Sequence, residues 1–280
     1  MMIEKTSSEI YGPVIQMIRK MKDLSPEERE ALFSDLYSIS EKVDKEFHSF
    51  DEEFIRIKNE STENEETIRK LNALIDKKMA STSPLDLADS EGECQIIYKD
   101  FWEKLDHYSQ QYLIMANYLF KLFTQNERDF SPSVLEFGRA VENELVQKIY
   151  IGYVSKLIGN TAGMIDKGSL YGALKKAIKE CAKEDGKFYI PAKEMVIYLT
   201  YLSNQEIINA YNEGLKEYLR EQNINADSIS EESFTDNAYE IFDKYRNVAA
   251  HPGGTMATGD ARTCKEKSKK VLRRFMNAIE

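Results

Sequence analysis

The residues in this sequence best suited to chemistry are an arginine and, five positions later, a histidine. Arg246 and His251 lie in the string DKYRNVAAHPGG at 243–254. A guanidinium can bind a phosphate through two hydrogen bonds, and an imidazole can move a proton near neutral pH. Without any metal ligand, such a pair can promote attack of a ribose 2′-hydroxyl on the adjacent phosphodiester. The pair therefore points to metal-independent cleavage of RNA.

A predicted helix over 234–251 positions the two residues, because its apolar side chains recur on one face. Pro252 and the two glycines after it end this helix, which leaves His251 at its C-terminus. There the helix dipole favours the imidazolium. Five positions correspond to about 140° around a straight helix. A shared site therefore requires a bend at Pro252 or a second copy of the chain.

The segment from Arg246 to His251 resembles the R-x4-6-H motif of HEPN domains, including the polar residue, here Asn247, that commonly follows the arginine. The upstream segment 134–145 resembles the early HEPN helix, which often carries a glutamate on its inner face. The resemblance covers about 130–280. It implies an α-helical bundle that homodimerises, brings two motifs into one composite cleft and acts as a metal-independent endoribonuclease. Such domains occur in toxins, abortive-infection systems and RNA-targeting defence proteins.

Carried over to this chain, the resemblance assigns His251 as the acid or base and Arg246 as the phosphate-binding and transition-state group. Asn247 would orient them or contact the backbone, and Glu142 is either a further site residue or an ordinary structural charge. Some members of the family have lost catalysis and act as dimerisation or RNA-binding modules, which is the alternative function. A third possibility is a bundle unrelated to RNA, in which Arg246 pairs with an acidic residue such as Asp243 and His251 caps the helix.

The charge distribution restricts where RNA could bind. The chain has 48 acidic and 38 basic residues and a net charge of −10, so an RNA partner needs a local basic patch. The predicted last helix, 260–279, carries an excess of five positive charges. The alternative is that these positive charges only form an ordinary solvated face of the helix. The candidate RNA-binding residues on it are Arg262, Lys265, Lys269 and Arg273.

The remaining pattern predicts an all-α protein. Only six prolines are present, and each stands where a helical pattern begins or ends. The apolar run at 195–202 has no strand neighbours and is better explained as a buried helix. The helices predicted after residue 94 are 95–124, 132–158, 169–184, 192–202, 204–221, 234–251 and 260–279.

The N-terminal part carries a seven-residue repeat. From Phe33 to Ile75, ten of the thirteen a and d positions are apolar, which predicts a long helix or a helical hairpin with a coiled-coil-like seam. The seam packs either within the chain or against a second protomer, and the polar interruption at Ser61 and Asn64 could instead be a turn. The expected domains are this region, 1–80, then a polar linker, 81–94, then the HEPN-like bundle, 95–280.

Other classes of site are not expected. Cys94, Cys181 and Cys264 are far apart and lack zinc-ligand spacing, so we predict reduced thiols and neither a metal nor a cofactor. We find no signal peptide and no membrane-spanning run, and we therefore expect a cytoplasmic protein. The expected partners are RNA, a second copy of the chain and an antitoxin or regulatory protein, and no membrane.

Overall fold

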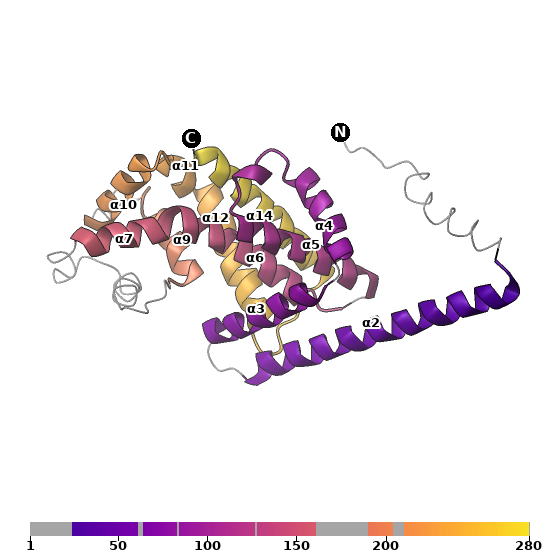
Figure 1. Cartoon of the computed structure of the whole chain (residues 1–280). Coiled ribbons are helices and arrows are strands. Elements are labelled where there is room, and N and C mark those ends of the chain that lie inside the picture. Colours follow the sequence, from indigo (N-terminus) through magenta and orange to yellow (C-terminus); the bar gives the residue numbers. More distant parts are fainter. Residues whose placement is uncertain are drawn as a thin grey trace. The chain divides into compact units, whose positions relative to one another are not determined.

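The computed structural model describes residues 24–60, 64–82, 84–126, 128–160, 190–203 and 210–279 (Figure 1). The protein is all-α, as predicted: this described part contains no strand, only one isolated antiparallel bridge between Ile224 and Ile279. The chain divides into two compact units, residues 1–54 and residues 55–280. Each unit is considered by itself.

The described part of the first unit belongs to one long helix, α2 (Pro26–Glu60), which continues into the second unit. A capping box begins this helix, because the Glu28 amide donates to Ser25 Oγ at 3.2 Å and the Ser25 amide donates to Glu28 Oε2 at 2.7 Å. The predicted apolar seam is covered unevenly. Phe50 and Phe54 are buried with ring centroids 6.0 Å apart, whereas Phe33 is 56% exposed.

The helices at the start of the second unit differ in two places from those expected from the sequence. Helix α3 (Asn64–Ser81) starts four residues after α2 ends, in keeping with the predicted break near Ser61. Helix α4 (Pro84–Ile97) runs through most of the 81–94 segment that the sequence analysis took for a polar linker. The polar composition of this segment did not indicate a helix, although one face of the helix is buried and carries Ser90 and Cys94. A 3₁₀ turn, η1 (Trp102–Lys104), also interrupts the predicted 95–124 helix.

The later helices agree more closely with prediction. The expected 132–158 helix is α6 (Ser131–Leu145), continued through a π-turn, η2 (Val146–Tyr150), into α7 (Ile151–Asn160). The expected 169–184 helix lies outside the described residues. The remaining elements are α5 (His107–Asn126), α9 (Ala192–Thr200), α10 (Ala210–Glu221), α11 (Ala226–Ser230), α12 (Glu232–Glu240), the π-turn η4 (Ile241–Arg246), α13 (Asn247–Ala250) and α14 (Thr258–Ala278).

Helix α6 is the centre of the second unit: it packs against α3, α5, α13, α14 and η4 (Figure 1). Small side chains allow this close packing. The Ser133 hydroxyl donates to the Ala116 carbonyl at 2.8 Å, and the Ser109 hydroxyl donates to the Ala140 carbonyl at 3.3 Å. Because α6 is enclosed, its charged residues must find partners inside the protein. Those residues build the candidate site.

Candidate functional site

Arg246, the arginine of the motif, is buried among protein carboxylates. It is the last residue of η4 and only 3% exposed. Its Nη2 donates to Glu142 Oε2 of α6 at 2.9 Å, and its Nη1 lies 3.5 Å from Glu65 Oε1 of α3. The fold therefore joins Arg246 and Glu142, two residues that the sequence had singled out. Asp243, proposed as an alternative partner, pairs instead with Lys193 at 2.7 Å.

A glycine makes room for this arginine. A Cβ built on Gly138, one turn before Glu142 on α6, would lie 3.3–3.5 Å from the Cβ, Cγ and Cδ atoms of Arg246. The aliphatic part of Arg246 thus packs directly on the α6 backbone while its guanidinium reaches the carboxylates. Such packing fixes the position of η4 and, with it, of α13.

A second arginine on α6 forms a matching contact with α3. Arg139 donates to both carboxylate oxygens of Asp76, at 2.6 and 2.9 Å, and contacts Glu136 at 3.4 Å. Its guanidinium also lies 4.1 Å from the centre of the Tyr112 ring. Helix α3 is therefore held by two ion pairs three helical turns apart, through Glu65 and Asp76. We call these six charged residues the α3–α6 ion cluster: Glu65, Asp76, Glu136, Arg139, Glu142 and Arg246.

Burial controls the protonation of this cluster. Desolvation raises the pKa of Glu136 from an ordinary value of 4.5 to about 7, although the charge of Arg139 opposes the shift. Desolvation also raises the pKa of Glu142, against the opposing effect of Arg246. Glu136 and Glu142 consequently hold their protons more tightly than exposed carboxylates would.

His251 differs sharply from Arg246, because it is exposed. It follows the last residue of α13 with extended backbone angles, φ −73° and ψ 142°, as expected before a proline. Its Nδ1 lies 2.8 Å from the Pro252 carbonyl oxygen, which can only accept a hydrogen bond. Nδ1 must therefore carry the proton in this contact. In the neutral ring, Nε2 then has the lone pair that a general base requires.

The turn after His251 is held at several points. The buried Lys58 ammonium donates to the Gly254 carbonyl, and Asp129 Oδ1 accepts from the Met256 amide at 2.8 Å. Burial lowers the pKa of Lys58, while Asp129, 3.6 Å away, partly offsets the effect. A Cβ on Gly254 would overlap the Val248 carbonyl oxygen, so only glycine fits there. His251 thus stands on a fixed turn.

Asn247, which the resemblance placed in the site, has an unusual environment. Its Oδ1 atom is covered, and within the described residues it has no hydrogen-bond partner. Covered polar atoms in native proteins are normally paired. Asn247 therefore offers an unused acceptor beside Arg246, and no contact in the described structure gives it an orienting role.

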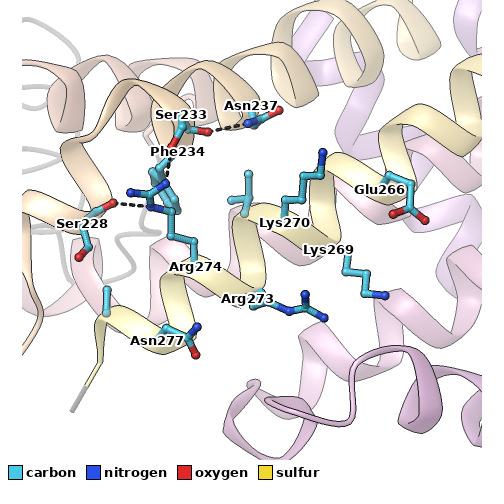
Figure 2. Close-up of a pocket in the computed structure, with 12 residues that line it drawn as sticks. Ser228, Ser233, Phe234, Asn237, Glu266, Lys269, Lys270, Arg273, Arg274 and Asn277 are labelled. Carbon is cyan, nitrogen blue, oxygen red and sulfur yellow. Dashed lines mark hydrogen bonds between the residues drawn. The ribbon is translucent and has the colours of Figure 1, made fainter. Parts of the chain in front are cut away.

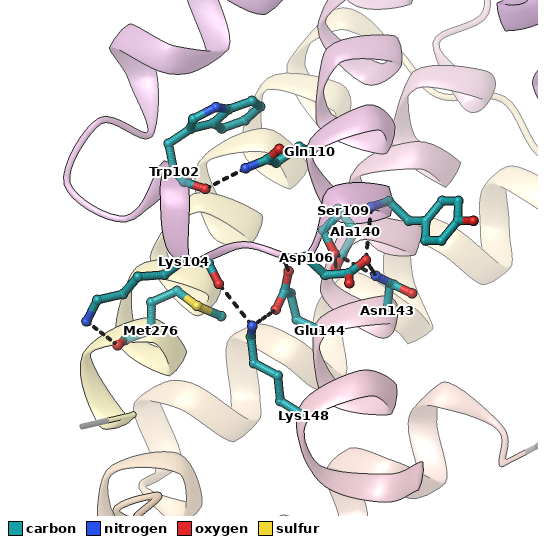
Figure 3. Close-up of polar contacts among 11 residues, drawn as sticks. Trp102, Lys104, Asp106, Ser109, Gln110, Ala140, Asn143, Glu144, Lys148 and Met276 are labelled. Atoms are coloured by element: carbon teal, nitrogen blue, oxygen red, sulfur yellow. Dashed lines mark hydrogen bonds and ion pairs between the residues drawn. The ribbon is translucent and has the colours of Figure 1, made fainter.

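Another polar network fixes the C-terminal turn of α6, next to Glu142 (Figure 3). Glu144 Oε1 accepts from the Asp106 amide at 2.7 Å, and its other oxygen lies 3.2 Å from Lys148 Nζ. Lys148 in turn donates to the Lys104 carbonyl at 2.9 Å, and Asn143 donates to Asp106 at 2.8 Å. These contacts anchor α6 to the turn before α5. The turn of α6 that carries Glu142 is therefore held by the network at Asn143 and Glu144 as well as by Arg246.

The four predicted RNA-binding residues of α14 have different surroundings. Arg262 is exposed near the start of the helix. Lys265 donates to Asn117 at 2.7 Å and lies 5.3 Å from the centre of the Phe120 ring, and burial lowers its pKa. Lys265 is thus engaged by the protein. Lys269 and Arg273 line a groove in the second half of the helix.

In the described ranges, no three His, Cys, Asp or Glu side chains are placed to hold a metal ion. None of the described helices combines the length and apolar character that crossing a membrane requires. Cys94 and Cys264 are buried, and burial raises the pKa of each thiol to about 12; Cys181 lies outside the described residues.

Comparisons with known protein families, with curated proteins and with solved structures found no match for this chain. The resemblance to HEPN domains therefore depends on the motif residues. Sequence reasoning named Arg246, His251 and Glu142, and it missed Glu65, Asp76, Glu136 and Arg139. One signal was available for two of these: Glu136, Arg139 and Glu142 recur at three-residue spacing, which places charges along one face of a helix that is otherwise buried.

Proposed function

We propose that this protein is a metal-independent endoribonuclease of the HEPN type. The observation that carries the proposal is that an exposed histidine follows a short helix whose first turn is anchored by a buried ion pair. His251 stands at the end of α13, and Arg246, immediately before α13, is locked to α6 through Glu142. A general base needs such a fixed position, because small misplacements of a catalytic group cost rate.

In the proposed reaction, Nε2 of His251 takes the proton of a ribose 2′-hydroxyl. The 2′-oxygen then attacks the neighbouring phosphorus, and the bond to the 5′-oxygen of the next nucleotide breaks. That oxygen leaves with a proton from an acid, which in a dimer is the protonated His251 of the second copy. The products are a 2′,3′-cyclic phosphate and a 5′-hydroxyl.

Arg246 has a defined place in this scheme. Its contact with Glu142 is the shorter one, 2.9 Å, and its contact with Glu65 is the longer, 3.5 Å. A phosphate that replaced Glu65 on Nη1 would leave the Glu142 pair intact. Arg246 would then neutralise charge that develops on the phosphate oxygens. We propose antiviral defence or a toxin–antitoxin stress response as the setting, with an antitoxin or regulatory protein as a further partner.

The test is cleavage of a mixed RNA pool in EDTA by the wild type and by the His251→Ala and Arg246→Ala variants. Cleavage that produces 2′,3′-cyclic phosphate ends, and that His251→Ala abolishes while the variant stays folded, is the expected result. Circular dichroism and sedimentation check folding and dimerisation. Cleavage indifferent to His251 would contradict the assignment.

One observation favours a second candidate, a non-catalytic dimerisation or binding module. The Arg246 side chain is only 4% exposed and already meets two carboxylates, as a purely structural arginine would. A folded dimer that cleaves no RNA in the same assay would support this alternative. The two candidates thus give opposite results in one experiment.

A further inference from the structure

A groove with basic walls lies along the second half of α14, away from the motif (Figure 2). Its volume is about 640 Å³, and α11, α12 and α14 contribute its walls. Four cationic side chains line it, with a single carboxylate, Glu266, among the lining residues. The cations are Lys269, Lys270, Arg273 and Arg274. This concentration of positive charge stands out on a chain of net charge −10.

These cations are not equally available to a ligand. Arg274 is held by the protein, because it donates to the Ser228 carbonyl at 3.0 Å and contacts Ser233 and Glu231. Arg273 makes one long contact, 3.5 Å, with an exposed carboxylate, Asp100, and is itself 46% exposed. Exposed pairs of this kind contribute little and exchange easily.

The two lysines are the most available of the four. Within the described residues, neither the Lys269 nor the Lys270 ammonium forms an ion pair or a hydrogen bond. Figure 2 shows Lys270 and Arg274 on the face of α14 turned toward α12, and Lys269 and Arg273 on the adjoining face turned away from it. The groove thus presents two rows of cations on neighbouring faces of one helix.

The spacing of the charges suits a chain of phosphates. Lys269 and Arg273, like Lys270 and Arg274, are four residues apart, which is about 6 Å along the helix axis. Cations repeated along one direction match a ligand whose negative charges also repeat. The exposed Asn277 amide at the edge of the groove adds a neutral hydrogen-bonding group for phosphate or sugar oxygens.

We infer that this groove binds the phosphodiester backbone of single-stranded RNA. Its volume is that of a small-ligand site, so it admits a few nucleotides of one strand and is too small for a duplex. Lys269 lies eleven residues after Thr258, the first residue of α14, and is therefore about 17 Å along the helix from its start. The groove is thus a second contact for a longer strand. That the ligand is RNA rests on the proposed function. That the ligand is a polyanion rests on the cations of the groove alone.

Binding without cleavage is the appropriate test. We would titrate a labelled single-stranded oligoribonucleotide with the full-length His251→Ala variant, which keeps the RNA intact, and follow fluorescence anisotropy at several salt concentrations. The same background would carry Lys269→Ala, Lys270→Ala and Arg273→Ala together. A matched control would carry Lys77→Ala, Lys216→Ala and Arg220→Ala, which remove the same charge from exposed positions on α3 and α10.

The groove variant is expected to bind RNA on the order of tenfold more weakly at low salt. The slope of log K against log salt should fall by about 2, because three phosphate contacts are lost. The control should change affinity less than twofold. Equal affinities for the groove variant and its parent, or no RNA binding by the parent, would overturn the inference. Neither result depends on cleavage, so the wild-type cleavage assay judges the proposed function separately.

Discussion

The two ends of the R-x4-H segment lie in opposite environments. Arg246 is 3% exposed and bound by carboxylates from two other helices, whereas His251, five residues later, is exposed on a fixed turn. A buried charge serves mainly to hold surrounding elements in place, and an exposed titratable group is available to a ligand. The two residues are therefore held differently. Arg246 packs against α6 and α3 and keeps η4 and α13 in place, whereas the His251 ring is open to solvent.

The same contrast separates the α3–α6 ion cluster from the basic groove of α14. In the cluster, each arginine is matched by carboxylates within the protein. In the groove, Lys269 and Lys270 have no such matches among the described residues. Matched charges stabilise the fold, and unmatched ones can attract a polyanion.

Removing Glu142, the main partner of the buried Arg246, should lower the stability of the protein the most. We expect Glu142→Ala to lower the free energy of unfolding by about 3–5 kcal/mol, because it leaves the Arg246 charge buried without its closest carboxylate. Urea denaturation measures the effect. Glu217→Ala, which removes an exposed carboxylate on α10, should change stability by less than about 0.5 kcal/mol. Similar losses for the two variants would show that the pair is not structural.

The next effect concerns pH and Glu136. The pKa of this buried carboxyl is about 7 when folded and near 4.5 when exposed, so the folded state binds its proton more tightly. Wild-type stability should therefore fall as the pH rises from about 4.5 to about 7. Glu136→Gln should remove that fall and gain at most about 3 kcal/mol relative to the wild type above pH 7. Urea denaturation at pH 5 and pH 8 measures it, and equal pH dependence in both proteins would refute it.

A smaller loss is expected from the turn that presents His251. An alanine at 254 would place its Cβ against the Val248 carbonyl oxygen, so Gly254→Ala should destabilise the protein by about 2 kcal/mol and displace the turn. Gly259→Ala is the matched control, since nothing lies within 4 Å of a Cβ there. Thermal unfolding compares the two. Equal melting temperatures for Gly254→Ala and Gly259→Ala would mean that the turn is not fixed by the close approach at Gly254.

The smallest stability effect should come from Glu65. Its contact with Arg246 is long and its side chain is 34% exposed, so Glu65→Gln should cost about 1 kcal/mol or less. If a phosphate takes the place of Glu65 on Arg246, the same change should lower KM for RNA several-fold. Steady-state kinetics beside urea denaturation separates the two effects. A higher KM at unchanged stability would argue against that role for Glu65.

Much of the fold could be predicted from local patterns. Apolar periodicity and the positions of proline predicted most of the helical segments after residue 130 that the structure describes, because those signals act within one or two turns; the short helix α11 (Ala226–Ser230) lies where no helix was expected. The region before it was harder. Helix α4 was taken for a linker because its exposed face is polar, and only the fold reveals that Ser90 and Cys94 are covered.

The site could be predicted only in part. Arg246, His251 and Glu142 were named from a motif, but the environment of Arg246 depends on Glu65, which is 181 positions away. A single sequence carries no signal for which helix docks at that distance. The prediction that Arg246 faces a phosphate therefore missed that α3 already supplies a carboxylate there.

The most direct test of the proposed function uses two defined substrates in EDTA. One is an oligoribonucleotide with a mapped cleavage position; the other is identical except for a 2′-deoxynucleotide on the 5′ side of that position. We predict that the wild type cuts the first to a 2′,3′-cyclic phosphate and leaves the second intact at that position, and that His251→Ala cuts neither. Equal cleavage of both substrates, or cleavage of the first by His251→Ala, would contradict proton transfer from the 2′-hydroxyl to His251.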